Sequence, residues 1–124
     1  MWRNIVEHPV EINPLALCDA STVSPDDLVV FEIHYTDRIG ENYFAKHNNN
    51  HELYYFNKIT QDEALLIKQW DSHGSIAKSN GRLSDNESID NPCTFSFHSA
   101  FEDPATREDA PDRWSMEVRC IVIY

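Results

Sequence analysis

The last eleven residues of the chain, 114–124, constrain the fold more than any other segment. Two sets of side chains alternate along it: Met116, Val118, Cys120 and Val122 with Glu117, Arg119, Ile121 and Ile123. Successive side chains of a β-strand point to opposite faces, so this pattern is typical of a strand that becomes buried on both faces. Such a strand needs a sheet beside it and packing on each side. We therefore expect a mainly β protein.

Other runs of β-branched and aromatic residues, bounded by turn residues, predict further strands at 2–6, 28–35, 42–47, 52–56 and 94–101. Residues 37–40 favour a hairpin turn. Thr60 and Glu63 fit a capping box, which predicts a short helix through Lys68, although the residues up to Trp70 fit a strand equally well. These elements predict a sheet or a partial barrel.

The chain has the length of one domain, with only three glycines and no internal repeat. We expect a single domain over 1–124. Residues 72–94 are mostly Ser, Asn, Asp and Gly with few large apolar groups, and we expect a mobile loop there.

Composition excludes several classes of protein. No apolar run approaches the roughly 20 residues of a membrane helix, and the amino terminus has no signal core, so we expect a cytoplasmic protein without a membrane partner. Lys and Arg total 10 against 21 Asp and Glu, and the net charge of −11 disfavours nucleic acid. Cys18, Cys93 and Cys120 are widely spaced with no CxxC pair, which favours buried thiols over a zinc site.

Two segments near the carboxyl end carry residues suited to chemistry. His98 stands among Phe95, Phe97 and Phe101, where apolar neighbours favour a dry cavity. Arg113 and Ser115 follow, and a guanidinium with a hydroxyl can grip a planar carboxylate. We rejected a metal site at His47 and His51, because Glu52 would point to the opposite face of a strand.

The chain resembles the fungal hydroxylase/desaturase family along nearly its whole length. Eight blocks carry the resemblance in order: WRNI at 2–5, PLALCDA at 14–20, GENY at 40–43, HELYYF at 51–56, DEALLIK at 62–68, DS at 71–72, HSAFEDP at 98–104 and RWSMEVR at 113–119. The resemblance implies a double-stranded β-helix, like a jelly roll, associated with non-haem iron and 2-oxoglutarate. The expected fold class is therefore an incomplete double-stranded β-helix or a β-sandwich, with one short helix.

Only part of the family's site is present in the sequence. The resemblance implies that His98 matches a distal iron ligand and that Arg113 with Ser115 matches the clamp for the cosubstrate carboxylate. The family's His-x-Asp pair lies in a half that precedes the Trp-Arg block, and this sequence contains no His-x-Asp or His-x-Glu. It resembles the carboxyl-terminal half only, so we expect no metal and no cofactor in this chain.

Three functions follow from this reading. The first is a metal-free tailoring enzyme of secondary metabolism that catalyses a cyclisation, isomerisation or dehydration of a natural-product intermediate. The alternatives are a split Fe(II)/2-oxoglutarate hydroxylase/desaturase that needs a partner for its iron site, or a non-catalytic binding half-barrel. Exposed strand edges, in particular residues 2–6, favour a homodimer.

The expected site residues form two groups. We assign catalysis to His98, Arg113, Asp71 and Tyr54, and substrate binding to His51, Ser115, Arg119 and Trp114. We expect His98 and Arg113 to face one cavity, with an acid such as Asp71, Glu117 or the ligand meeting the arginine.

Overall fold

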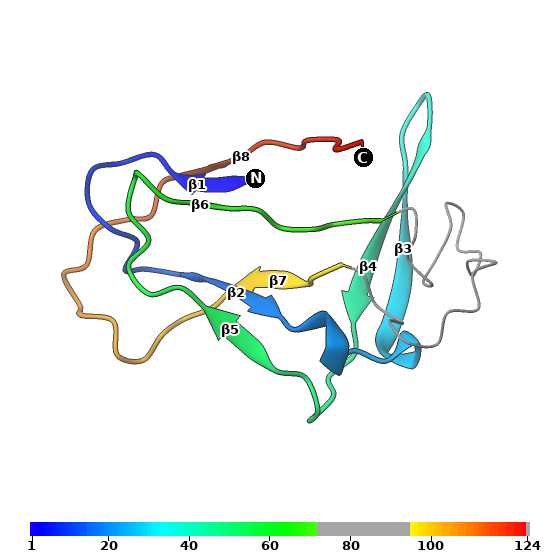
Figure 1. Ribbon diagram of the computed structural model, residues 1–124, viewed down its shortest axis with the longest axis horizontal. Coiled ribbons are helices and arrows are strands. Elements are labelled where there is room, and N and C mark those ends of the chain that lie inside the picture. The colour runs from blue at the N-terminus through cyan, green and yellow to red at the C-terminus, as the bar shows by residue number, and fades with distance from the viewer. Residues whose placement is uncertain (72–94, 124) are drawn as a thin grey trace. The chain divides into compact units, whose positions relative to one another are not determined.

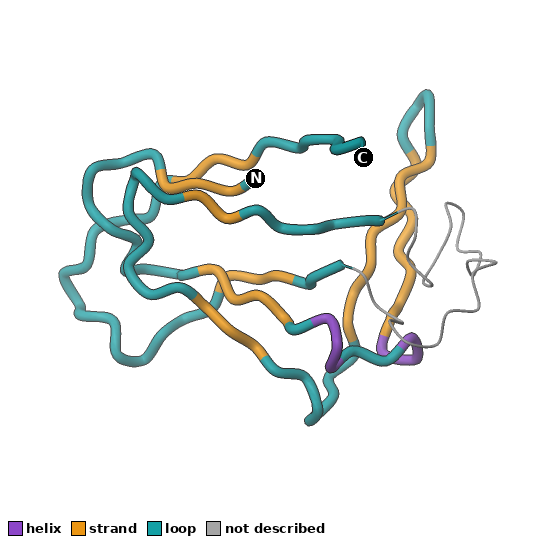
Figure 2. Tube along the Cα trace, viewed as in Figure 1, coloured by secondary structure: helices purple, strands orange, loops and turns teal. Residues whose placement is uncertain are grey.

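The computed structural model describes residues 1–71 and 95–123. Its elements follow each other along the chain as short strands and two 3₁₀ turns (Figures 1 and 2). In order they are β1 (Trp2–Asn4), β2 (Leu15–Cys18), η1 (Ala20–Thr22), η2 (Pro25–Asp27), β3 (Leu28–His34), β4 (Ile39–Ala45), β5 (Leu53–Tyr55), β6 (Ala64–Leu65), β7 (His98–Ala100) and β8 (Ser115–Glu117).

The chain divides into two compact units. Unit 1 comprises Met1–Leu17, Tyr54–Ile67 and His98–Tyr124, and unit 2 comprises Cys18–Leu53 and Lys68–Phe97. The expectation of a single domain stays a prediction. The loop expected at 72–94 lies outside the described residues.

Unit 1 is built on two three-stranded sheets, ordered β6-β1-β8 and β5-β2-β7. β1 is antiparallel to both of its neighbours, with Trp2 opposite Leu65 on one side and opposite Glu117 on the other. β2 is antiparallel to β7, with Leu17 opposite His98. A core of Trp2, Val10, Leu15 and Ile59, with Leu65 and Ile67 packed against it, holds this unit together.

The fully buried side chain of Asn4 organises the first turn of unit 1. Its Nδ2 donates to the carbonyl oxygens of Val6 and His8, and Val6 donates its backbone N–H to Asn4 Oδ1. Buried backbone carbonyls need partners, and one amide side chain supplies them here. This arrangement places the end of β1 against the start of β8, where Ile5 donates to the carbonyl of Trp114.

Unit 2 contains the β3–β4 hairpin and its own core. The two strands pair over seven residues each, from Leu28 opposite Ala45 to His34 opposite Ile39. The buried core is Cys18, Val23 and Phe95, against which Ala20, Leu28, Tyr43 and Phe97 pack. A hairpin turn joins the two strands as predicted, but it lies at residues 35–38 rather than 37–40, because β4 begins at Ile39.

The short helix expected after Thr60 is absent from the described residues. The capping contact itself forms, because the backbone N–H and hydroxyl of Thr60 both donate to Glu63 Oε2 at 2.8 Å. The chain then enters β6, where Leu65 pairs with β1 and packs against the core of unit 1. Tertiary pairing therefore outweighs the local signal, and the helices are instead 3₁₀ turns at η1 and η2.

Two expectations about the first and last strands were wrong. β1 is the central strand of its sheet, so the edge expected at residues 2–6 is already paired on both sides. The closing strand expected over 114–124 is observed only as β8. Beyond it, the side chains of Ile121, Val122 and Ile123 are exposed rather than buried. β2 was missed, because its four residues show no clear alternation.

The expected fold class is confirmed: the chain is mainly β with antiparallel sheets. None of the helices among residues 1–71 and 95–123 is long or apolar enough to cross a membrane.

Candidate active site

Ser115 is the first residue of β8 in unit 1, and Arg113 lies two residues before it. Ser115 pairs with Asn4 of β1, and the Arg113 guanidinium lies over the Trp2 ring, 6.0 Å from its centroid. Arg113 also donates to the backbone carbonyl of Asn13. Both side chains come from one short stretch of chain and both residues are half-buried. A guanidinium has five N–H donors, and the bond to Asn13 occupies one Nη1 donor.

His98 begins β7 and is half-buried. The backbone of β7 pairs with β2, which fixes the position of His98 opposite Leu17. β7 and β8 belong to different sheets of unit 1. The expectation that His98 and Arg113 face one cavity stays a prediction.

Three further predicted residues of unit 1 are solvent-exposed. Tyr54 lies in β5, Trp114 directly precedes β8, and Arg119 follows it. The backbone carbonyl of Trp114 accepts a hydrogen bond from the N–H of Ile5. The residue is 62% exposed. Their roles in catalysis and binding stay predictions.

His51 and Asp71 belong to unit 2, each with a local partner. His51 Nε2 lies 3.0 Å from Asp27 Oδ2, and both side chains are about nine-tenths buried. Asp71 forms an ion pair with Lys68. Asp71, one of the acids expected to meet Arg113, is therefore paired within its own unit.

Asp27 is the centre of a buried polar cluster that sequence reasoning missed. It accepts from the side-chain amide of Asn48, from the backbone N–H of Ser24 and from His51. These hydrogen bonds, the Asn48 amide first, hold the pKa of Asp27 below its usual range. The detectable signal was Ser24 followed by Asp27, a spacing at which a carboxylate accepts a backbone N–H.

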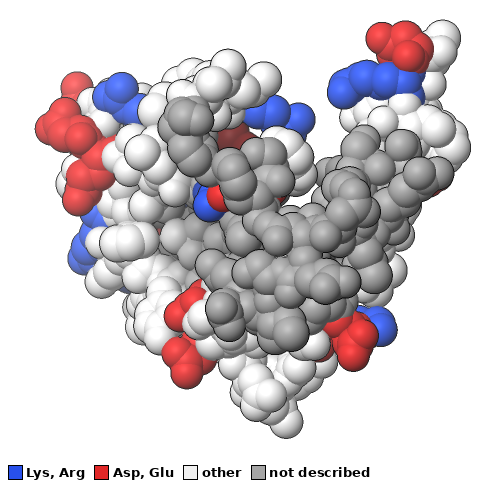
Figure 3. Space-filling model, turned by 45° about the vertical axis from the view of Figure 1, so that its right-hand side comes forward, with Lys and Arg blue, Asp and Glu red and all other residues white. Residues whose placement is uncertain are grey.

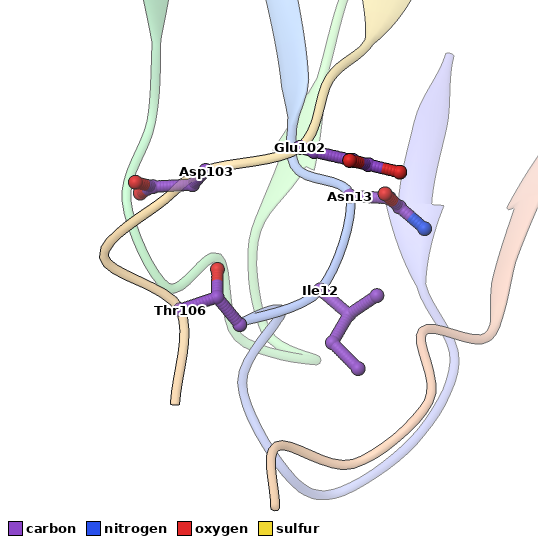
Figure 4. Close-up of a pocket in the computed structure, with 5 residues that line it drawn as sticks. All are labelled: Ile12, Asn13, Glu102, Asp103 and Thr106. Atoms are coloured by element: carbon purple, nitrogen blue, oxygen red, sulfur yellow. The ribbon is translucent and has the colours of Figure 1, made fainter. Parts of the chain in front are cut away.

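A pocket of about 280 Å³ lies elsewhere in unit 1 (Figure 4). Its lining residues are Ile12, Asn13, Glu102, Asp103 and Thr106. The two carboxylates point in opposite directions in Figure 4, so they do not form a pair for acid–base or metal chemistry. Neither His98 nor Arg113 lines this pocket.

The residues present do not by themselves fit an iron site. Across residues 1–71 and 95–123, no three His, Cys, Asp or Glu side chains lie close enough together to hold a metal ion. Iron oxygenase sites of the two-histidine, one-carboxylate type need three such ligands.

On the face drawn in Figure 3, acidic and basic side chains lie in several separate groups.

Comparison with known proteins identifies the family. Residues 1–123 match the family model described as "Oxidoreductase/YMDC permease-like domain". The chain belongs to this oxidoreductase family. It is a partial relative of the fungal hydroxylase/desaturase proteins, as its sequence blocks predicted.

Three curated relatives show the extent of the match. The chain is 35% identical to aspirochlorine biosynthesis protein N of Aspergillus oryzae, covering 100% of this chain and 46% of that protein. It is 34% identical to the Fe(II)/2-oxoglutarate-dependent dioxygenase nvfI of Aspergillus novofumigatus (98% and 38%). It is 32% identical to the hydroxylase/desaturase poxK of Penicillium oxalicum (92% and 38%). The chain therefore spans less than half the length of these relatives.

A solved structure agrees with the sequence matches. The iron and alpha-ketoglutarate-dependent endoperoxidase NvfI superposes with a TM-score of 0.69 at 29% identity, covering 92% of this chain and 37% of that chain. These relatives contradict the expectation of a chain without cofactors, because they point to iron and 2-oxoglutarate. The expectation treated the missing ligands as evidence that iron chemistry is absent, whereas the chain matches less than half the length of relatives that are named for that chemistry.

Proposed function

We propose that this chain is part of an Fe(II)/2-oxoglutarate-dependent oxygenase that acts on small-molecule intermediates of fungal secondary metabolism. The observation that carries the proposal is the shared fold with NvfI over 92% of the chain. The match to hydroxylase/desaturase relatives supports the same conclusion. Both favour the partial oxygenase over metal-free cyclisation, isomerisation or dehydration.

Within that enzyme, Arg113 and Ser115 bind the carboxylate of 2-oxoglutarate. The Trp2 ring below the guanidinium and the Asn13 carbonyl restrict the side chain of Arg113. Pairing of β8 with β1 holds Ser115 in register beside it. A positioned guanidinium forms charge-assisted, bidentate hydrogen bonds with a carboxylate, which a flexible lysine does not reproduce.

His98 supplies one ligand to the iron, which activates oxygen when bound. The described residues contain no complete set of three ligands, so His98 would be one ligand among others that these residues do not supply. His98 suits this role because the β2–β7 pairing fixes its backbone, and a fixed imidazole needs little reorganisation to bind a metal.

The first test is titration of the chain with 2-oxoglutarate, followed by ligand-observed NMR. We expect Arg113→Ala to weaken binding by about tenfold or more, since charged hydrogen bonds contribute about 1.5–3 kcal/mol. Arg107→Ala is the matched control, because Arg107 is paired with Glu11 and Asp109 in the same unit. Equal binding by wild type and Arg113→Ala, or no binding by wild type, would contradict this assignment.

A further inference from the structure

Asn13 has a backbone conformation that its sequence neighbours disfavour. Its φ is 49°, and among the described residues only one other non-glycine residue, Lys58, has a positive φ. Asn13 also directly precedes Pro14, and a residue before proline favours extended backbone. Side chains disfavour positive φ, although asparagine tolerates it better than most residues. The surrounding structure must therefore hold Asn13 in place.

The segment around Asn13 is fixed at both ends. Before it, Val10 belongs to the buried core and donates its backbone N–H to the carbonyl of Ile59 at 3.0 Å. After it, the carbonyl of the buried Pro14 accepts from the N–H of Phe101 at 3.2 Å, and β2 begins at the next residue. Asn13 itself is exposed, so its neighbours in the chain, rather than packing of its side chain, determine its conformation.

The left-handed backbone presents the carbonyl oxygen of Asn13 to Arg113. Nη1 of this guanidinium donates to that oxygen, and the Trp2 ring lies on the guanidinium with its centroid 6.0 Å from Cζ. Because Pro14 has no backbone N–H, the peptide between Asn13 and Pro14 offers an acceptor and no donor. A carbonyl oxygen and an aromatic face are both favourable neighbours of a cation, and together they fix the direction of the guanidinium.

This direction leaves donors of Arg113 for a ligand. Within residues 1–71 and 95–123, the guanidinium donates to Asn13 through Nη1 only, so Nε and Nη2 remain. These two N–H groups lie along one edge of a planar group, and such a pair binds both oxygens of a carboxylate. A carboxylate in the place of the Asn13 carbonyl would neutralise the guanidinium, whereas a neutral carbonyl leaves its positive charge to the ligand.

Asn13 also connects the two sheets of unit 1. Arg113 lies two residues before β8 of the β6-β1-β8 sheet, whereas the chain from Asn13 runs directly into β2 of the other sheet (Figure 4). β2 in turn pairs with β7, where Leu17 lies opposite His98. The segment that holds the guanidinium is therefore continuous with the strand that fixes the backbone of His98.

We propose that Asn13 is a positioning residue whose left-handed backbone aims its carbonyl at Arg113 and thereby fixes the guanidinium for a carboxylate ligand. This inference rests on the proposed function, which names 2-oxoglutarate as that ligand. The conformation of the backbone performs the role, and the amide side chain does not. Glycine adopts positive φ readily and should replace Asn13, whereas a β-branched residue should not.

The first measurement follows the arginine itself, by ¹⁵N NMR of the guanidinium groups with Arg113→Lys to assign the signals. A guanidinium held by a hydrogen bond rotates slowly about its Nε–Cζ bond and gives separate Nη1 and Nη2 signals, whereas a freely rotating one gives a single averaged signal. We expect separate Arg113 signals in the wild type and in Asn13→Gly, and an averaged signal in Asn13→Val. Asn13→Ala is a milder second variant that carries the test where Asn13→Val does not fold, and its signals should exchange faster than those of the wild type.

Lys58→Val is the matched control, because Lys58 has a φ of 56° in the same unit. Its ion pair with Glu11 is long, at 3.9 Å, so the substitution tests mainly the backbone. This variant should lose stability, as Asn13→Val does, and keep the Arg113 signals separate. Circular dichroism checks that each variant retains the fold.

The second measurement is titration with 2-oxoglutarate. Asn13→Val should bind it more weakly by about fivefold or more, because a hydrogen bond that positions a charged group is lost. Asn13→Gly should bind it within about twofold of the wild type, because glycine keeps the conformation.

Four results would overturn the inference: an averaged Arg113 signal in the wild type, in Asn13→Gly or in Lys58→Val, or separate signals in Asn13→Val. The NMR measurement needs no ligand, so the two proposals fail separately. The expected signals without 2-oxoglutarate binding by the wild type would support the positioning role and contradict the proposed function. Binding that Arg113→Ala weakens and Asn13→Val does not would support the proposed function and contradict the positioning role.

Discussion

At the scale of single residues, Asp27 is the polar group on which the loops of unit 2 depend. It joins Ser24 to Asn48 and His51 across a gap of more than 20 residues in sequence. Removing an acceptor from a buried cluster leaves its donors without partners, which costs more than the bond itself contributes. The cluster thus links the start of β3 to the segment that follows β4.

Asp27 predicts a defined pH dependence of stability. Its pKa is lower in the folded chain than in the unfolded chain, so its contribution is complete above about pH 4 and is lost as the pH falls through the folded value. Asp27→Asn should reduce stability more at pH 6 than at pH 3. Urea unfolding of both proteins at the two pH values measures this, and an equal difference at both would contradict it.

His51 has a partner that the sequence did not predict, and its role in substrate binding stays a prediction. The sequence predicts a histidine for substrate binding, whereas the structure pairs its Nε2 with Asp27 and sets its ring edge-on to Phe97. The sequence separation of His51 and Asp27 gives no signal for this contact. Arg113 is different, because its neighbours Trp114 and Ser115 belong to the same recognisable block.

At the scale of elements, the β3–β4 hairpin depends on one of its two faces. Tyr43 packs against the core of unit 2 and stacks on Phe95 with ring centroids 5.5 Å apart. The next residue, Phe44, points to the opposite face, is 58% exposed, and contacts Phe31. A two-stranded hairpin alone is marginally stable, so the packed face supplies its stability.

Two adjacent aromatic residues therefore predict unequal effects. Tyr43→Ala should lower the free energy of unfolding by about 2–4 kcal/mol, because it removes a packed aromatic ring. Phe44→Ala should cost about 1 kcal/mol or less, since it removes an exposed cross-strand pair. Urea unfolding followed by far-ultraviolet circular dichroism compares them, and equal losses would show that the faces are assigned incorrectly.

The elements that the sequence did not resolve share a physical cause. β2 was missed, and β6 lies where a helix and a strand fitted equally well; both strands are short and are defined by their pairing partners, not by alternation or local propensity. The strands at 28–34 and 53–55 were predicted because β-branched and aromatic residues concentrate there. The closing strand was predicted longer than observed, because the alternation continues to Ile123 whereas β1 pairs only with Ser115–Glu117.

At the scale of the whole molecule, the chain carries part of a site and part of a fold. The family resemblance predicted the class of protein, which the comparisons confirm at the level of the family. The residues of the clamp stay a prediction. The cofactor prediction was wrong, because it gave more weight to the missing His-x-Asp pair than to the family, whose members point to iron and 2-oxoglutarate. The expectations of a homodimer and of a cytoplasmic location stay predictions.

The most direct test of the central claim is succinate formation by an oxygenase that contains this chain. The matched region of NvfI is replaced by residues 1–124, and conversion of 2-oxoglutarate to succinate is measured with and without Fe(II). We expect turnover that requires Fe(II), falls at least 100-fold in His98→Ala, and persists in His34→Ala, a histidine exposed on the β3–β4 hairpin. Turnover that is independent of Fe(II), or that is unchanged in His98→Ala, would contradict the account.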